Sequence, residues 1–342
     1  MNNIDPRSIR VFGQGGNMLP MRNSVYYPLD LTENPVKVIG GEDGKFNNND
    51  YILFYGEGPE GYNSESNTNI NAYTNKAYYF INVNSGGNAK QVQDYIEPTG
   101  VANTTINTFH DYQFHELDEY NLAKLGRRWF GDRFDFDPDK VFDFEVKNIV
   151  TSEPVALKVY AAAVGVVQTS MRVRVNGTDV DNFTFPAINS PILATQDFFN
   201  GNINVTSGNI SVNLTYNNNG NPTSEGYLDY ISIEATRSLE GVGEQFLFKN
   251  NNVPLLSGIA QYDLSNASNI TEVWDVTDKY NITAIQNSDA LNTLSFKAQL
   301  GEERTYIAID DSDFYTPKSE SKSRVVNQNI KGTVFENTQG QF

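Results

Sequence analysis

Short runs of alternating apolar and polar residues, separated by turns, fill the chain between residues 138 and 238. Phe142 and Phe144 alternate with charged residues, and the dipeptide of Asn176 and Gly177 has the composition of a tight turn. A period of two places alternate side chains on opposite faces of a strand. Several short strands with regular turn signals within about 100 residues are typical of a β-sandwich. We therefore predict a central β-sandwich over residues 138–238.

Residue usage in the rest of the chain also favours strands. The chain has 26 Gly, 19 Tyr and 21 Phe among its 342 residues, together with many Asn, Thr and Ser. Aromatic and β-branched residues favour the pleated surface of a sheet, while Asn and Gly favour the turns between strands. Helical spacing of apolar residues occurs at 117–125, where Gly126 follows as a C-terminal cap. We predict a mainly β protein with two or three β-rich domains and one short helix.

The length of the chain is enough for two or three domains with separate cores. We predict an N-terminal β-rich domain with the short helix over residues 1–137, followed by the sandwich. A third β-rich domain is predicted over 239–317, because apolar runs again alternate with turns there. Residues 318–342 begin with a polar stretch and are predicted to form a linker. Both ends of the sequence read like the interior of a longer protein, so we expect a chain trimmed at both ends.

The charge and the absence of cysteine exclude several kinds of function. Lys and Arg total 25 against 42 Asp and Glu, which gives a formal net charge of -17. Such a field repels nucleic acids and anionic lipid surfaces, and it favours solubility. Without cysteine the chain has no disulfide framework, no thiolate metal site and no thiol nucleophile. No apolar run approaches the roughly 20 residues that a membrane helix needs.

An acidic, asparagine-rich turn lies between two apolar runs at 36–39 and 51–55, as in a hairpin with a long loop. Within it Asp43, Asn47 and Asp50 have the oxygen ligands and the spacing of the second half of a calcium loop. The first half of such a loop is missing. The same residues are also typical of a hydrogen-bonded Asp/Asn turn. Calcium is thus a candidate cofactor at these three residues, with the plain turn as the alternative.

A dense basic and aromatic cluster follows the predicted helix at Arg127, Arg128 and Trp129. Arg and Trp are the residues most enriched at the energetic centres of protein interfaces, so the cluster is a candidate partner contact. The structural alternative is an arginine stacked on Trp129, which would fix the end of the short helix.

Catalytic signals are sparse. His110 and His115 are the only histidines, and their odd spacing puts them on opposite faces of a strand. Carboxylate pairs such as Asp310 and Asp311 arise by chance in a chain this acidic, although glycosidases need two such groups. We therefore assign no catalytic residue and predict that this chain is not itself an enzyme.

Several motifs taken in order are specific enough to indicate a family. They are SIRVFGQGGNMLP from Ser8, DLTEN from Asp30, DGKFNNNDYILFYGEGP from Asp43, NKAYYF from Asn75, HELDEYNLAKLGRRWFGDRF from His115 and WDVTD from Trp274. Over residues 8–320 the chain resembles the N-terminal region of the PorU family, the gingipain-like sortases of type IX secretion. The start departs from the family pattern, because a leader and a first strand would be expected before Ile4.

The resemblance implies a cellular location and a function. Members of the family are implied to sit on the bacterial cell surface, held at the outer membrane by the barrel protein PorV. They are implied to remove the C-terminal signal domain of secreted cargo and to attach the cargo to anionic lipopolysaccharide. That chemistry uses a Cys–His dyad in a caspase-like domain that follows the β-rich region and is missing from this sequence. The chain is therefore expected to serve domain packing and docking of PorV or cargo, with residues 318–342 leading toward the missing catalytic domain.

A free-standing surface adhesin or carbohydrate-binding β protein is the alternative to this function. Its support is the aromatic and asparagine-rich composition, since aromatic rings stack on sugars. In β-sandwiches, however, aromatic side chains more often fill the core.

Overall fold

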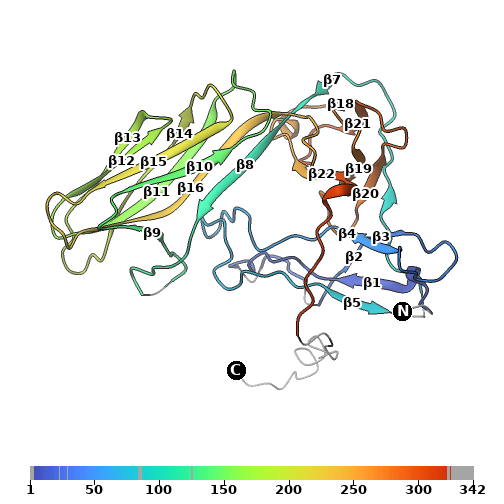
Figure 1. Ribbon diagram of the computed structural model, residues 1–342, viewed down its shortest axis with the longest axis horizontal. Coiled ribbons are helices and arrows are strands. Elements are labelled where there is room, and N and C mark those ends of the chain that lie inside the picture. The colour runs from blue at the N-terminus through green and yellow to red at the C-terminus, as the bar shows by residue number, and fades with distance from the viewer. Residues whose placement is uncertain are drawn as a thin grey trace.

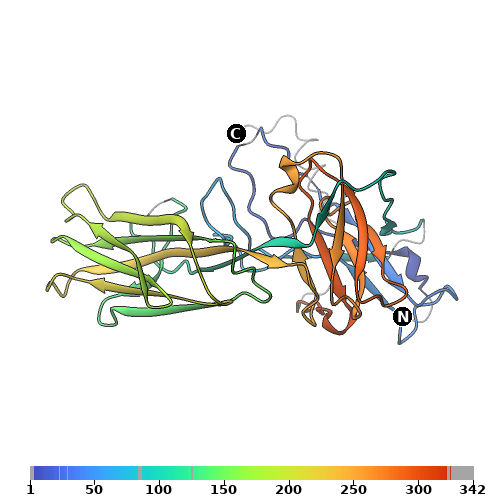
Figure 2. The same ribbon diagram turned by 90° about the horizontal axis from the view of Figure 1, so that it is seen from above.

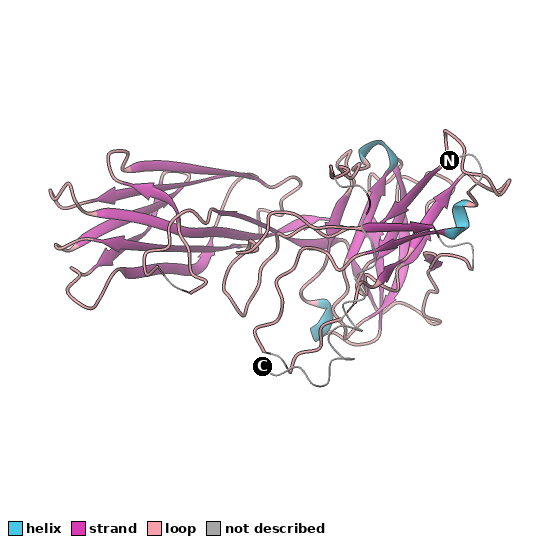
Figure 3. Cartoon of the chain, turned by 90° about the horizontal axis from the view of Figure 1, so that it is seen from below, coloured by secondary structure: helices cyan, strands magenta, loops and turns pink. Residues whose placement is uncertain are grey.

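The computed structural model describes residues 4–22, 24–28, 30–83, 87–124, 126–321 and 324. Two strand-rich lobes lie side by side along the longest axis, and small sheets of the N-terminal region lie beside the second lobe (Figures 1 and 2). Strands dominate the described residues, and the helical elements there are three short 3-10 turns (Figure 3). These turns are η1 (Pro6–Ser8), η2 (Val253–Leu255) and η3 (Asp311–Asp313). The mainly β prediction is confirmed.

The first lobe is a β-sandwich, as the alternating pattern predicts. Its four-stranded sheet has the order β10 (Asp139–Glu145), β15 (Asn209–Asn217), β12 (Thr169–Val175) and β13 (Thr178–Phe185). The facing sheet has the order β14 (Thr195–Ile203), β11 (Val155–Val164), β16 (Glu225–Ser238) and β8 (Thr108–Glu116), with β9 (Gly131–Phe134) also paired to β16. Alternate residues of both sheets, such as Leu157, Val173 and Leu214, are fully buried in one core between them. Burial of these apolar side chains stabilises the sandwich.

The second lobe packs two further sheets around an aromatic core. One sheet has the order β17 (Phe246–Phe248), β22 (Tyr306–Asp310), β19 (Ile270–Asp275), β20 (Thr283–Gln286) and β6 (Gln93–Asp94). The other has the order β21 (Leu294–Gln299), β18 (Ile259–Leu264) and β7 (Thr104–Ile106). Phe296 stacks on Tyr262 with ring centroids 5.0 Å apart and contacts the ring of Tyr306 at 5.2 Å. Both β6 and β7 join these sheets in parallel, so the lobe is closed by strands from the N-terminal part of the chain.

Two small sheets complete the N-terminal part. One has the order β2 (Glu33–Asn34), β1 (Ile9–Phe12) and β5 (Phe80–Val83), and the other pairs β3 (Val36–Ile39) with β4 (Tyr51–Phe54). The second is antiparallel, which confirms the predicted hairpin around the acidic turn. An ion pair and a hydrogen bond join this part to the second lobe: Lys279 Nζ lies 2.5 Å from Glu57 Oε2 and also donates to the carbonyl of Gln14.

The long strands β8 and β16 connect the two lobes (Figure 1). Phe109, near the start of β8, belongs to the aromatic core of the second lobe, whereas the rest of the strand lies on the sandwich. The buried Arg237 on β16 covers this junction. Its guanidinium carbon lies 5.0 Å from the ring centroid of Phe109, and it pairs with Asp111 at 3.4 Å. The lobes thus share two strands and a buried cation.

The predicted short helix is wrong. The described residues of 117–125 form no helix, and Tyr120 instead pairs with Phe130 across a β-bridge. Tyr120 packs on Tyr227 with ring centroids 5.3 Å apart, and Leu122 joins the same buried cluster on the sandwich. Docking these apolar side chains on a sheet stabilises the segment more than its weak intrinsic helix preference does. Leu125 lies outside the described residues.

The limits of the predicted domains remain a prediction. Most of the predicted linker, residues 325–342, lies outside the part of the chain that the structure describes. Among the described residues, no helix has the length and apolarity needed to cross a bilayer.

Candidate docking surface

A hollow of about 280 Å³ opens between the segment that follows β1 and the loop at residues 60–73. Met18, Pro20 and Val25 line one side, and Tyr62 and Glu65 line the other. Here the backbone N–H of Met21 donates to Glu65 Oε2 at 2.9 Å, so the two walls are joined. Among the lining residues, Val25 and Tyr62 are 46% and 44% exposed, and the sequence neighbours Leu19 and Tyr26 are 62% and 86% exposed. Exposed apolar side chains grouped around a hollow are typical of a protein-binding surface.

The loop at 60–73 is held against the sandwich by one buried carboxylate. Glu116, at the end of β8, accepts hydrogen bonds from Thr68 Oγ1 at 2.5 Å, from the backbone N–H of Asn69 at 2.7 Å and from its amide at 2.8 Å. Tyr112 and Tyr230 donate to the side chains of Asn69 and Asn67, respectively. Burial raises the pKa of Glu116, although these hydrogen bonds act in the opposite direction. The position of the loop therefore depends on the sandwich.

Aromatic rings extend this surface across the outer face of the sandwich sheet. Phe198, Tyr160 and Tyr230 lie on neighbouring strands and stack in a row, with centroids 4.9 and 5.0 Å apart. Tyr62 of the loop reaches the same face, since Lys158 Nζ lies 5.2 Å from its ring centroid. Phe198 ends the row and is 52% exposed. Tyr230 is fully buried, so the accessible part of the row is Phe198 and the half-buried Tyr160. These two rings and the hollow form one candidate docking surface that spans the N-terminal part and the sandwich.

The predicted partner contact lies at the border of this surface. Arg127 lies over the exposed ring of Tyr73 and within 3.4 Å of Ser66 Oγ, both on the loop. Arg128 forms an ion pair with Asp229 at 2.7 Å and covers the ring of Phe130. The rings beneath the two arginines are thus Tyr73 and Phe130, in place of the stacking on Trp129 that the structural alternative predicts. Trp129 is half-buried, and a role of the cluster in binding stays a prediction.

Two carboxyl groups beneath this border make the folding stability of the protein depend on pH. Burial raises the pKa of Asp229 to about 6, although Arg128 acts in the opposite direction. Burial also raises the pKa of Asp118 to about 6, and the charge of Glu116 adds to the rise. Between about pH 4 and 6 the folded protein keeps protons on these groups that the unfolded chain has released. Their contribution to stability is therefore largest at low pH and is lost as the pH rises through about 6.

Urea unfolding between about pH 4 and 7 tests this linkage. We expect the difference in unfolding free energy between the wild type and Asp229→Asn to change across this range, with the wild type losing more stability as the pH rises. The variant removes one of the two titrating groups while keeping the size of the side chain. Parallel pH profiles of the two proteins would contradict the assignment.

The acidic turn closes on itself through hydrogen bonds. Asp43 accepts from the backbone N–H of Lys45 at 2.9 Å and from the Asn47 amide at 3.2 Å. Asp50 accepts from the backbone N–H of Asn47 at 2.7 Å. The three side chains predicted from the sequence are thus brought together, and their contacts are those of an Asp/Asn turn. A cation would have to replace these hydrogen bonds in order to bind.

The histidines lie apart on β8. The Nδ1 of His110 faces the backbone N–H of Asn251 at 3.1 Å, and the Nε2 of His115 lies 2.6 Å from Asp132 Oδ2. Burial lowers the pKa of His110. In the part of the chain that the structure describes, no group of three or more His, Cys, Asp or Glu side chains has an arrangement that could hold a metal.

Sequence reasoning missed the docking surface itself. It had no means of pairing the loop at 60–73 with Glu116, or Arg128 with Asp229, because the partners lie more than 40 positions apart. The one available signal was the set of apolar residues in the extended segment after β1, where Met18, Leu19 and Met21 have no strand pattern to explain them.

Comparisons with known proteins include an extended likeness to a solved structure. No family model and no curated protein sequence matches the chain. The crystal structure of dimeric latent PorU from Porphyromonas gingivalis matches with a TM-score of 0.71 at 20% identity, over 90% of this chain. The resemblance to PorU is confirmed at the level of the fold. The chain spans only 30% of the length of that PorU chain.

Two carbohydrate-binding modules match smaller parts. The module CBM36, solved in complex with calcium and xylotriose, has a TM-score of 0.22 at 17% identity and covers 29% of this chain and 75% of its own. A CBM35 module from Cellvibrio japonicus has a TM-score of 0.24 at 12% identity and covers 40% and 94%. These scores are too low to indicate a shared fold with the chain.

Proposed function

We propose that this chain is the non-catalytic N-terminal region of a PorU-like sortase, the C-terminal signal peptidase of type IX secretion. The observation that carries the proposal is the likeness to latent PorU over 90% of the chain. The absence of cysteine agrees with it, because the chain has no thiol nucleophile for a cysteine peptidase. The peptidase chemistry would then belong to a part of the protein outside this chain.

The docking surface defines what the region does in this proposal. Its exposed apolar side chains would pack against the rest of the sortase, or bind PorV or secreted cargo. Arg127 and Arg128 at its border are basic groups in a chain of net charge -17 and would orient an acidic partner. The protein would work at the bacterial cell surface, associated with the outer membrane through PorV.

Capture by PorV tests the docking role. We expect the purified chain to bind PorV held in detergent, and the double substitution Leu19→Asp with Tyr26→Asp to weaken binding about tenfold or more, since buried charges disrupt apolar contacts. Leu255→Asp is the matched control, because this exposed leucine lies in η2 on the second lobe.

Two outcomes would count against the proposal. If PorV captures the wild type, the double variant and Leu255→Asp equally, the docking surface has no part in binding PorV. Cleavage of a cargo signal domain by the purified chain would contradict the non-catalytic role as a whole.

Calcium at the acidic turn is a separate proposal. Its support is that Asp43, Asn47 and Asp50 converge, as the hydrogen bonds among them require. Calorimetric titration with calcium chloride, with magnesium chloride as the comparison, decides between an ion site and the hydrogen-bonded turn.

A further inference from the structure

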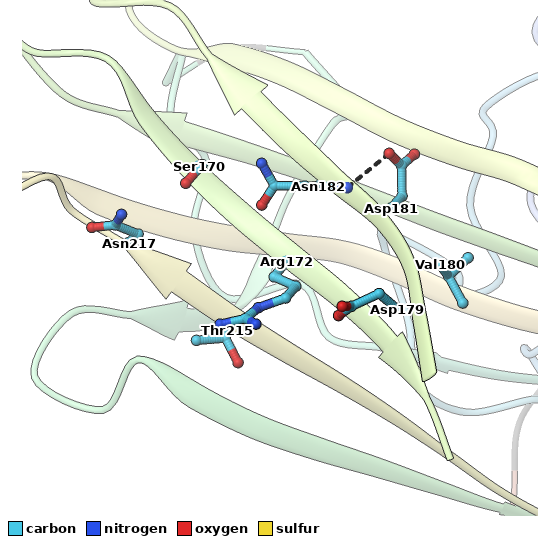
Figure 4. Close-up of a pocket in the computed structure, with 8 residues that line it drawn as sticks. All are labelled: Ser170, Arg172, Asp179, Val180, Asp181, Asn182, Thr215 and Asn217. Carbon is cyan, nitrogen blue, oxygen red and sulfur yellow. Dashed lines mark hydrogen bonds between the residues drawn. The ribbon is translucent and has the colours of Figure 1, made fainter. Parts of the chain in front are cut away.

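A groove of about 440 Å³ lies on the outer face of the four-stranded sandwich sheet, over β12, β13 and β15 (Figure 4). This face is the one turned away from the sheet that carries the aromatic row, so the groove is separate from the docking surface. A volume of this size is within the range of small-molecule binding sites. The proposed function makes no use of it.

The strand register explains how the groove forms. Arg172 on β12 lies opposite Asn182 on β13 and Thr215 on β15, so three polar side chains share one row. A bulge in β13 adds one residue, Val180, which packs against the sandwich core. Asp179 and Asn182 are three positions apart and would lie on opposite faces of a regular strand. The extra residue lets both line the groove.

Two of the three charged groups of the groove are not used by the fold, whereas the third, Asp181, accepts from the backbone N–H of Asn182 at 2.8 Å. Within the described residues, no hydrogen bond or ion pair engages the guanidinium of Arg172 or the carboxylate of Asp179, although both line the same space. Figure 4 shows Arg172 extending toward Thr215, with Asp179 on its other side. The neighbouring Arg174 differs, because it donates to Asn213 Oδ1 at 2.7 Å. Arg172 and Asp179 are therefore both available to a ligand.

This set of groups matches a ligand rich in hydroxyls. A hydroxyl accepts from a guanidinium and donates to a carboxylate, so neighbouring hydroxyls of a sugar would satisfy Arg172 and Asp179 together. Ser170 and Asn182 add a second hydroxyl and an amide to the same lining. One arginine and two aspartates, Asp179 and Asp181, give the groove a net negative charge in an already acidic protein. An anionic ligand is disfavoured by that field.

We propose that this groove binds a neutral oligosaccharide, with Arg172 as the donor and Asp179 as the acceptor to adjacent hydroxyls. The site is independent of the docking surface and of any PorU-like role. A basic peptide would also meet the two carboxylates, but it would place its cations against the unpaired guanidinium of Arg172. Like charges within one groove oppose binding.

Calorimetry with neutral hexasaccharides tests the site on the purified chain. The probes are cellohexaose, xylohexaose and mannohexaose, with a heparin hexasaccharide and a Lys/Arg hexapeptide as the anionic and cationic comparisons. We expect saturable binding of at least one neutral hexasaccharide, and at least about tenfold weaker binding by Arg172→Ala and by Asp179→Asn. Glu145→Gln is the matched control, because this exposed carboxylate lies in β10 on the same sheet, outside the groove. Thermal unfolding confirms that all the variants are folded.

Three results would overturn the proposal. The first is that none of the neutral hexasaccharides binds. The second is that binding occurs but is as strong in both groove variants as in Glu145→Gln, which places the sugar elsewhere. The third is that the heparin hexasaccharide or the basic peptide binds more tightly than any neutral hexasaccharide, which assigns the groove to another class of ligand.

Discussion

Replacing Glu116 by alanine is expected to lower the free energy of unfolding by about 3 kcal/mol and to release the loop at 60–73 from the sandwich. The buried carboxylate accepts three hydrogen bonds from Thr68 and Asn69, and the alanine variant leaves those donors without a partner. Each buried donor that loses its acceptor costs about 1–3 kcal/mol. Relief of the desolvated carboxylate, whose pKa burial already raises, offsets part of this loss.

Urea unfolding measures the loss, and hydrogen exchange measures the release of the loop. We expect faster exchange at Asn69 and its neighbours, with little change in the strands of the second lobe. Glu153→Ala is the control, because this carboxylate is exposed and should change stability by less than about 0.5 kcal/mol. If Glu116→Ala behaves like the control, the loop is held by its apolar contacts and the carboxylate is not its anchor.

Replacing Phe296 by alanine is expected to cost about 4 kcal/mol of stability, which is the larger of the two effects. The ring is fully buried, and it contacts the rings of Tyr262, Tyr306 and Tyr95 with centroids 5.0, 5.2 and 6.1 Å away. Alanine removes this apolar burial and leaves a cavity that a closely packed core fills only in part.

Phe136→Ala is the matched control, since this phenylalanine is 93% exposed and its removal opens no cavity. Chemical unfolding of both variants is followed by the fluorescence of the two tryptophans, Trp129 and Trp274, of which Trp274 lies in β19 of the same lobe as Phe296. Equal stability of the two variants would mean that the aromatic core of the second lobe is not packed as described.

The sandwich could be predicted from local sequence alone. Strand alternation such as that of Phe142 and Phe144 is a local pattern, and it fixes which face of each strand is buried wherever the chain goes. The hairpin around the acidic turn was predictable for the same reason, because its two strands are close in sequence.

The short helix was predicted wrongly because its pattern is ambiguous. Apolar spacing over 117–125 fits a helix, but Tyr120 and Leu122 have a buried surface on the sandwich to pack against. That surface is formed by Ala162 and Tyr227, which are distant in sequence and invisible to a local pattern. Tertiary packing outweighs helix preference, which amounts to only a few tenths of a kcal/mol per residue.

By itself the sequence determined the mainly β class, the sandwich and the lack of a thiol nucleophile, because each depends on residue type or on neighbours along the chain. Only the tertiary structure decided which residues come together: Glu116 with the loop at 60–73, Asp229 with Arg128, and Arg172 and Asp179 as lining residues of one groove. These arrangements join segments far apart in sequence or depend on a bulge that shifts a strand by one residue. Their geometry is fixed by packing and strand register, which no local pattern of residues encodes.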